Sequence, residues 1–200
     1  MKPWVVAITG ASGAVYGVRL VKAVTESGYA VEVIISEAAR LVIREELGMA
    51  LKSYTRAEDL TGLFGPQIEG RLTAHSPRDF SAAVASGSYP TEGMVIIPCS
   101  MGTLGAVASG ISQNLIHRAA DCTLKEGRKL VLVPRETPLH EIHLENMLKL
   151  ARMGARIVPA MPAFYAGAQR LDEMIDFLTG KVLDQMGIAH ALYPRWTGVL

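Results

Sequence analysis

Two charged residues stand side by side in the segment VPRETPLHEIH. Arg135 and Glu136 follow the apolar run KLVLVP, so they lie where a strand is expected to end. A guanidinium group binds phosphate through paired hydrogen bonds, and a carboxylate beside it can accept or donate a proton. The pair therefore predicts an anion site with an acid–base group. His140 and His143 have no nearby acidic third ligand in a known pattern, so we predict no metal there.

The second candidate is the turn GASG at residues 10–13, which follows an apolar run and precedes a helical pattern. Free backbone N–H groups at a helix start bind anions. The dinucleotide fingerprint needs glycine at positions 12 and 15, where this chain has Ser12 and Val15, so a nicotinamide cofactor is not supported. A nucleophile elbow needs glycine where the chain has Ala14. Two interpretations stay open, a phosphate-binding turn and a tight turn in which Ser12 caps the helix.

Hydroxyl residues end two further apolar runs. Ser36 follows VEVII, where a helix cap is the simplest interpretation. In PCSMGT, Ser100 and Thr103 lie at another expected helix start, where they either cap the helix or hold a ligand. Cys99 belongs to the apolar run, which predicts a buried and unreactive thiol. Glu46 lies near a helix C-terminus, where its charge opposes the helix dipole and does not stabilise the helix.

Cations and aromatic residues occur later in the chain. Arg118 and Lys125 are seven residues apart, which places both on one face of an expected helix, facing either a phosphate or solvent. Tyr165 in the segment PAFY can hydrogen-bond an anion, and Trp196 in the tail is a candidate lid or interface residue. Lys181 alone is typical of a surface. For each residue taken by itself, packing or a solvated surface is the simpler interpretation.

The elements that must position these residues alternate between apolar strands and amphipathic helices. This alternation predicts a single Rossmann-like (flavodoxin-like) α/β domain, an open parallel sheet with helices on both faces. Such a sheet binds ligands outside the carboxyl ends of its strands, so the candidate residues are expected at one rim. Strands are expected at 4–9, 31–36, 71–75, 94–100, 129–134 and 155–160, and helices at 14–27, 37–47, 56–63, 79–86, 101–109, 114–126, 137–154 and 171–187.

Length and composition narrow the possible partners. The 200 residues suit one domain, residues 1–200, with residues 188–200 as an irregular tail. The 20 basic and 19 acidic residues nearly cancel and form no basic patch, which argues against nucleic acid and membrane as partners. The first apolar run is too short for a signal peptide or a membrane span. Two cysteines form neither a disulfide framework nor a metal motif, so we expect a cytoplasmic protein.

Taken together, these segments resemble the UbiX-like flavin prenyltransferases. The resemblance runs through TGASGAVYGVRL, PCSMGTLGAVASGISQNLIHRAAD, LVPRETPLHEIHLENMLKLARMGA and PAFY, nearly the whole chain. It implies an enzyme that joins a dimethylallyl group from dimethylallyl phosphate to N5 and C6 of reduced FMN, without a metal. The product, prenylated FMN, would serve a UbiD-like decarboxylase, in ubiquinone synthesis or aromatic acid degradation. The resemblance also implies a homo-oligomer, expected to be a homododecamer.

The resemblance implies a role for each matching residue. Glu136 would be the main acid–base group, Ser12 would lie near the reactive flavin edge, and Glu46 would be a second acidic residue, from the same or a neighbouring subunit. Lys181 would bind the phosphate group of the prenyl donor at a position where some relatives have arginine. Lysine keeps the positive charge there but cannot form the bidentate hydrogen bonds of arginine. The FMN site would comprise Gly10, Ala11, Ser12, Ser36, Ser100, Met101, Gly102, Thr103 and Arg135. The substrate-binding set would comprise Arg118, Lys125, Arg135, Tyr165 and Lys181, to which we add the candidate lid Trp196.

Two alternatives stay open beside the prenyltransferase. Flavin-dependent cysteine decarboxylases have the same fold, but they carry an asparagine-containing motif where this chain has PCSM at residues 98–101, which disfavours them. The second alternative is a non-catalytic carrier of prenylated FMN. A flavin that gains mass during incubation would separate the prenyltransferase from both.

Overall fold

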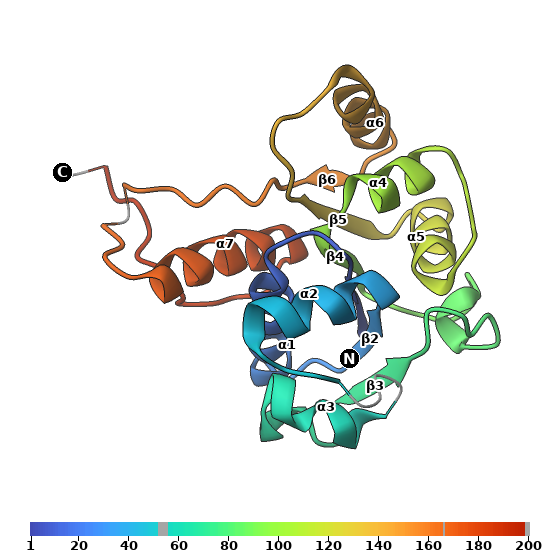
Figure 1. Cartoon of the computed structure of the whole chain (residues 1–200), viewed down its shortest axis with the longest axis horizontal. Coiled ribbons are helices and arrows are strands. Elements are labelled where there is room, and N and C mark those ends of the chain that lie inside the picture. The colour runs from blue at the N-terminus through green and yellow to red at the C-terminus, as the bar shows by residue number, and fades with distance from the viewer. Residues whose placement is uncertain (52–55, 166, 199–200) are drawn as a thin grey trace.

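The computed structural model describes residues 1–51, 56–165 and 167–198. Its centre is a six-stranded parallel sheet with the order β3-β2-β1-β4-β5-β6 (Figure 1). This is a doubly wound order, in which the strand sequence reverses direction between β1 and β4. The predicted open parallel sheet is therefore confirmed. The strands are β1 (Trp4–Ile8), β2 (Val31–Ile35), β3 (Leu72–His75), β4 (Gly93–Cys99), β5 (Lys129–Pro134) and β6 (Arg156–Ile157).

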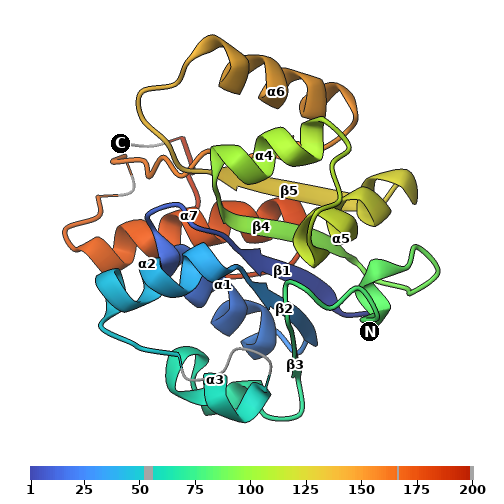
Figure 2. The ribbon, with the colours of Figure 1, turned by 45° about the vertical axis from the view of Figure 1, so that its right-hand side comes forward.

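Helices cover both faces of this sheet (Figure 2). Successive residues of β1 point to opposite faces, so that Val6 packs with α1 and α7 while Val5 packs with α4 and α5. The central strands are buried on both sides, which explains their continuous apolar sequences. The helices are α1 (Ala14–Glu26), α2 (Glu37–Leu47), α3 (Ala57–Phe64), α4 (Met101–Ala108), α5 (Leu115–Lys125), α6 (Glu141–Arg152) and α7 (Leu171–Met186), with short 3-10 turns at Pro66–Ile68 and Ala83–Ala85.

Two expected helices differ from the structure. The helix predicted at 79–86 is wrong, because the Asp79 carboxylate accepts hydrogen bonds from the N–H and hydroxyl of Ser81 and forms a local turn instead. The helix predicted from residue 137 begins only at Glu141. Thr137 precedes Pro138, and a residue before proline is disfavoured in the helical conformation.

The last expected strand is also shorter than predicted. The segment 155–160 forms regular strand pairs only at Arg156–Ile157. Val158 and Ala160 still donate hydrogen bonds to carbonyls of β5, but Pro159 between them has no N–H to donate. The chain beyond β6 therefore follows the sheet for a few residues and then leaves it.

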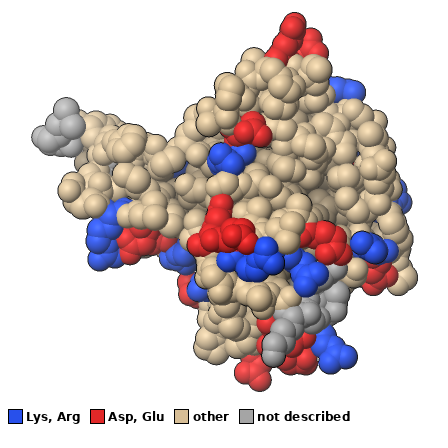
Figure 3. All heavy atoms as spheres, in the orientation of Figure 1, with Lys and Arg blue, Asp and Glu red and all other residues tan. Residues whose placement is uncertain are grey.

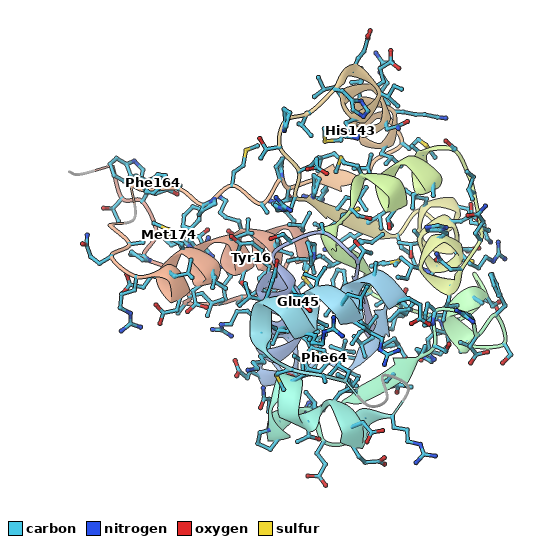
Figure 4. All side chains as sticks on the ribbon, in the orientation of Figure 1. Tyr16, Glu45, Phe64, His143, Phe164 and Met174 are labelled. Carbon is cyan, nitrogen blue, oxygen red and sulfur yellow. The ribbon has the colours of Figure 1, made fainter. Side chains whose placement is uncertain are left out.

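A projecting region of the molecule, which we call the arm, comprises residues 161–165, 167–177 and 193–198. It extends away from the sheet (Figure 1), and Phe164 lies at its far end (Figure 4). Large apolar side chains are exposed on the arm and also on α6, including Met161, Phe164, Leu171 and Trp196 on the arm and Ile142, Leu144, Leu148 and Met153 near or on α6. Among the described residues, no helix has both the length and the apolar character needed to cross a bilayer.

Candidate functional site

The predicted flavin-binding segments meet at one rim of the sheet. The turn 10–13 follows β1, Ser36 follows β2, Ser100 follows β4 and Arg135 follows β5. These four strands are neighbours and parallel, so their carboxyl ends lie along one edge, at the point where the strand order reverses. On the face seen in Figure 3, charged side chains gather in a band over α2, and the surface between that band and α6 carries little charge.

One buried threonine fixes two of these segments relative to each other. The Thr9 hydroxyl donates to the Pro98 carbonyl at 2.7 Å and accepts from the N–H of Ser100 at 2.8 Å. Its side chain is only 1% exposed. Thr9 thereby holds the start of α4 beside the turn after β1. The sequence shows it only as the polar end of an apolar run, which is too weak a signal to assign it this role.

The turn after β1 is closed by an acidic residue from α2. The Glu46 carboxylate accepts hydrogen bonds from the N–H groups of Gly13 and Ala14 at 2.9–3.0 Å. Gly13, with a φ of 99°, is the residue that precedes the helix, and it has a left-handed conformation that favours glycine. The interpretation of Ser12 as the helix cap is therefore wrong. The Ser12 side chain is exposed at the rim, and Glu46 reaches this turn within its own chain.

The two other serines do cap helices. The Ser36 hydroxyl accepts from the N–H of Ala39 at 3.1 Å, and the Ser100 hydroxyl accepts from the N–H of Thr103 at 3.3 Å. A helix start leaves its first N–H groups without intrahelical acceptors, and at α4 these belong to Met101 and Gly102. A Cβ added at Gly102 would meet no atom within 4 Å. The start of α4 thus combines donors with open space, which fits a phosphate or a flavin ring.

Arg135 and Glu136 border a cavity of about 430 Å³ at the end of β5. The Arg135 Nε donates to the Ser12 carbonyl at 3.1 Å, which joins the β5 and β1 ends. The Glu136 side chain is exposed, and its Oε1 accepts from the N–H of Thr137 at 3.0 Å. The rest of the cavity wall is mostly apolar and was not predicted as part of a site: Pro134, Leu139, Leu144, Met147, Pro159, Ala160 and Met161.

The two predicted cations of α5 lie elsewhere. The Arg118 Nε donates to the Ala85 carbonyl at 2.9 Å, and the Lys125 Nζ lies 2.5 Å from Glu126, beside Gly87. They share one face of α5, as predicted, but Lys125 ends that helix shortly before β5 begins. Since β5 is six residues long, its two ends are roughly 17 Å apart. Lys125 therefore cannot reach the rim of its own chain.

The remaining predicted residues belong to α7 and the arm. Tyr165 and Trp196 contact edge to face, with ring centroids 5.9 Å apart, and they line a hollow separate from the rim cavity. Lys181 lies half-exposed on α7. The structure therefore brings together the predicted flavin-binding residues with Glu46 and Glu136. It does not bring Arg118, Lys125 or the arm to that place within one chain.

Two further predictions concern reactive side chains. Cys99 is fully buried, as predicted, and this burial raises the pKa of its thiol to about 12, which disfavours the reactive thiolate. Both cysteines are free thiols. His140 and His143 stack on each other with centroids 3.5 Å apart. Within the described ranges, no group of three or more His, Cys, Asp or Glu side chains is arranged to hold a metal ion.

The sequence resembles known proteins over nearly its whole length. Residues 1–183 match the Flavoprotein family. The flavin prenyltransferase UbiX of Alkalihalophilus pseudofirmus is 53% identical over 96% of this chain and 94% of its own length. The flavin prenyltransferase UbiX of Pseudomonas aeruginosa is 47% identical over 95% of this chain and 91% of its own length.

Solved structures of UbiX-like proteins are also similar to this chain over nearly its whole length. AnUbiX in complex with FMN and dimethylallyl pyrophosphate superposes with a TM-score of 0.87 and 38% identity, covering 100% of this chain and 99% of AnUbiX. A dodecameric FMN-dependent UbiX-like decarboxylase from Escherichia coli O157:H7 superposes with a TM-score of 0.85 and 43% identity. The match covers 98% of this chain and 100% of the decarboxylase. The peptidyl-cysteine decarboxylase EpiD, at 12% identity and a TM-score of 0.59, shares the fold alone.

Proposed function

The chain belongs to the Flavoprotein family and, within it, to the UbiX-like flavin prenyltransferases, and from this membership we propose its reaction. It transfers the dimethylallyl group of dimethylallyl phosphate to N5 and C6 of reduced FMN and so makes prenylated FMN. The observation that carries the proposal is the AnUbiX complex, which holds both FMN and dimethylallyl pyrophosphate and matches this chain from end to end.

FMN fits the rim, where donors and open space coincide. Ser36 and the start of α4, residues 100–103, would hold it with hydroxyl and N–H groups, and Arg135 would bind it at the end of β5. Gly10, Ala11 and Ser12 would border its reactive edge. Reduced FMN supplies an electron-rich ring, which favours an allylic cation near its face.

The charged residues have distinct tasks in the transfer. The allylic C–O bond breaks with its electron pair remaining on the phosphate, so Arg135 and the lysines stabilise the leaving anion without a magnesium ion. Bond formation at N5 releases the N5 proton, and the prenyl double bond takes up a proton at its middle carbon before its tertiary carbon joins C6. C6 then releases its proton, and Glu136 or the departing phosphate carries out these transfers. Glu46 contributes indirectly, because its carboxylate fixes the turn that carries Ser12.

A second copy of the chain would complete the phosphate side of the site. Lys125 cannot reach the rim of its own chain, and Arg118 is bonded to the Ala85 carbonyl. Tyr165, Lys181 and Trp196 lie on α7 and the arm. The exposed apolar residues of the arm and α6 are suited to burial between copies. A relative of 43% identity is dodecameric. We therefore propose a homododecamer in which the cations of one copy meet the rim of another.

Two further expectations belong to this proposal. A UbiD-like decarboxylase would receive the prenylated FMN, because the product is itself a cofactor. A cytoplasmic location would suit the two free thiols of the chain. The cysteine decarboxylases remain the second candidate, but EpiD and SpaF, at 12% and 16% identity, share only the fold with this chain.

The mass of the flavin tests the reaction directly. The protein is incubated anaerobically with reduced FMN and dimethylallyl phosphate in the presence of a chelator. A flavin that gains one five-carbon unit is the expected result, and an unchanged flavin mass would refute it. A parallel incubation with the diphosphate identifies the preferred donor. Release of carbon dioxide from cysteine-ended peptides would instead favour the decarboxylase.

A further inference from the structure

One carboxylate near the end of α7 collects the polar side chains of the C-terminal tail. The two Asp184 oxygens accept from the two terminal nitrogens of Arg195, both at 2.8 Å, in a bidentate pair. The Tyr193 hydroxyl donates to the same carboxylate at 2.7 Å, and the His190 Nε2 lies 3.1 Å from it. Asp184 is thus the only residue of a regular element in this network, and the tail residues gather around it.

Aromatic contacts also join the tail to Phe177 of α7 and to Tyr165. The Arg195 guanidinium lies 5.0 Å from the centroid of the Tyr193 ring, and Tyr193 packs on Phe177 at 4.8 Å. Phe177 contacts Tyr165 at 5.6 Å, and Tyr165 contacts Trp196 at 5.9 Å. The residue directly after the anchored arginine is therefore the tryptophan that faces Tyr165.

Packing of the buried Tyr193 on Phe177 holds the tail only up to residue 193. Residues 194–198 belong to no helix or strand, and Trp196 is 55% exposed. The Asp184 side chain is 25% exposed and that of Arg195 is 53% exposed, and the bidentate geometry makes their bond stronger than an ordinary surface ion pair. Without this bond, the residues after Tyr193 would lose a fixed point, and Trp196 would lose its place beside Tyr165.

We propose that Asp184 is a positioning residue, which through Arg195 holds the C-terminal tail so that Trp196 and Tyr165 form one wall for the prenyl donor. The inference rests on the proposed function, since it takes these two aromatic residues as part of the substrate site. Asp184 itself touches neither substrate. Its effect on the donor is transmitted by Arg195 and the adjoining tryptophan.

Tryptophan fluorescence tests the anchor independently of the reaction. The chain has two tryptophans, and Trp4 is only 2% exposed, so quenching by acrylamide reports mainly Trp196. Acrylamide is neutral and therefore insensitive to the charge changes. In Asp184→Asn and Arg195→Gln, we expect stronger quenching and a KM for dimethylallyl phosphate about tenfold higher, with a smaller change in kcat. The double variant should be no worse than Asp184→Asn alone, because that change already removes the pair with Arg195.

Asp172→Asn is the matched control, because it breaks an exposed ion pair with Arg170 at the start of the same helix. It should change neither quenching nor KM. Unchanged quenching in the two test variants would overturn the proposal, and so would stronger quenching with an unchanged KM. Additive effects in the double variant would also overturn it. If the unaltered protein fails to prenylate FMN, the proposed function fails, while the quenching still shows whether Asp184 holds the tail.

Discussion

At the rim, the ends of β1, β4 and β5 are tied to one another within a single chain, by the hydrogen bonds of Thr9 to Pro98 and Ser100 and of Arg135 to Ser12. On α5, α7 and the arm, by contrast, the candidate phosphate-binding residues are exposed or half-buried and lie in separate places. Lys125 pairs with its neighbour Glu126, and Trp196 contacts the Tyr165 ring.

This difference shows which half of the site the fold alone can build. Parallel strands bring their carboxyl ends to one edge, so we propose that one chain supplies most of the flavin half. We propose that the cations of the phosphate half form a site only when another copy is placed against them. The following predictions test this division, beginning with the largest effect.

The largest effect is expected at the rim itself. Glu136→Gln keeps the shape of the side chain but cannot accept a proton, so kcat should fall about 10²- to 10⁴-fold. Binding of FMN should be nearly unchanged, because no predicted FMN contact is removed. Flavin titration and single-turnover mass measurements check both statements. Turnover at the rate of the unaltered protein would exclude Glu136 from proton transfer.

A smaller and different effect is expected on α5. Lys125→Ala should raise the KM for dimethylallyl phosphate by about 10- to 100-fold, the value of a lost hydrogen bond to a charged group. Because Lys125 belongs to the phosphate half, the affinity for FMN should stay the same. Lys22→Ala on α1 is the control and should affect neither. A loss of FMN affinity in Lys125→Ala would contradict the division of the site into two halves.

The rigidity of the rim can be tested at a glycine of α1. A Cβ at Gly17 would lie 2.5 Å from the Ile97 carbonyl oxygen and 2.9 Å from the Ile8 side chain. Gly17→Ala should therefore lower the free energy of unfolding by about 1–3 kcal/mol. Gly62→Ala on α3 is the control, since its nearest atom would be at 3.6 Å, and it should be neutral or stabilising. Urea unfolding of both variants measures the difference, and equal midpoints would disprove tight packing at Gly17.

The smallest effect concerns acid stability at the arm. Hydrogen bonds, above all from Arg195, hold the pKa of Asp184 well below its usual range despite partial burial. An acid whose pKa is lower in the folded state stabilises the fold above its unfolded pKa, about 3.9, and loses that contribution as the pH falls towards the folded value. The thermal midpoint of the unaltered protein should exceed that of Asp184→Asn at pH 7, and the gap should shrink below about pH 4. A constant gap would contradict this assignment.

The sequence was sufficient to predict the parallel sheet and the residues that lie at its rim. Apolar runs such as VEVII mark strands buried on both sides, and the polar residue after each run marks the rim. Local side-chain bonds were less visible: the turn made by Asp79 removed an expected helix, and the bond from Glu46 to the turn after β1 joins segments 33 residues apart. Neither follows from a periodic pattern.

The outward-facing half of the site was harder to predict for a further reason. Seven-residue spacing put Arg118 and Lys125 on one helix face, and this was correct, but spacing does not show towards which edge of the sheet a helix ends. Exposed apolar residues on α6 and the arm look like core residues in a sequence. Their position becomes clear only when the helices have been placed on the sheet.

Mixed oligomers test the central claim most directly. Glu136→Gln and Lys125→Ala proteins are coexpressed, purified together and assayed for prenylated FMN at a limiting concentration of dimethylallyl phosphate. If each site takes Glu136 from one copy and Lys125 from another, random mixing leaves about a quarter of the sites intact, so activity should return to roughly that fraction. Coexpression of Glu136→Gln with the double variant is the control and should stay inactive. A mixture of the two single variants no more active than either parent would contradict a site shared between copies.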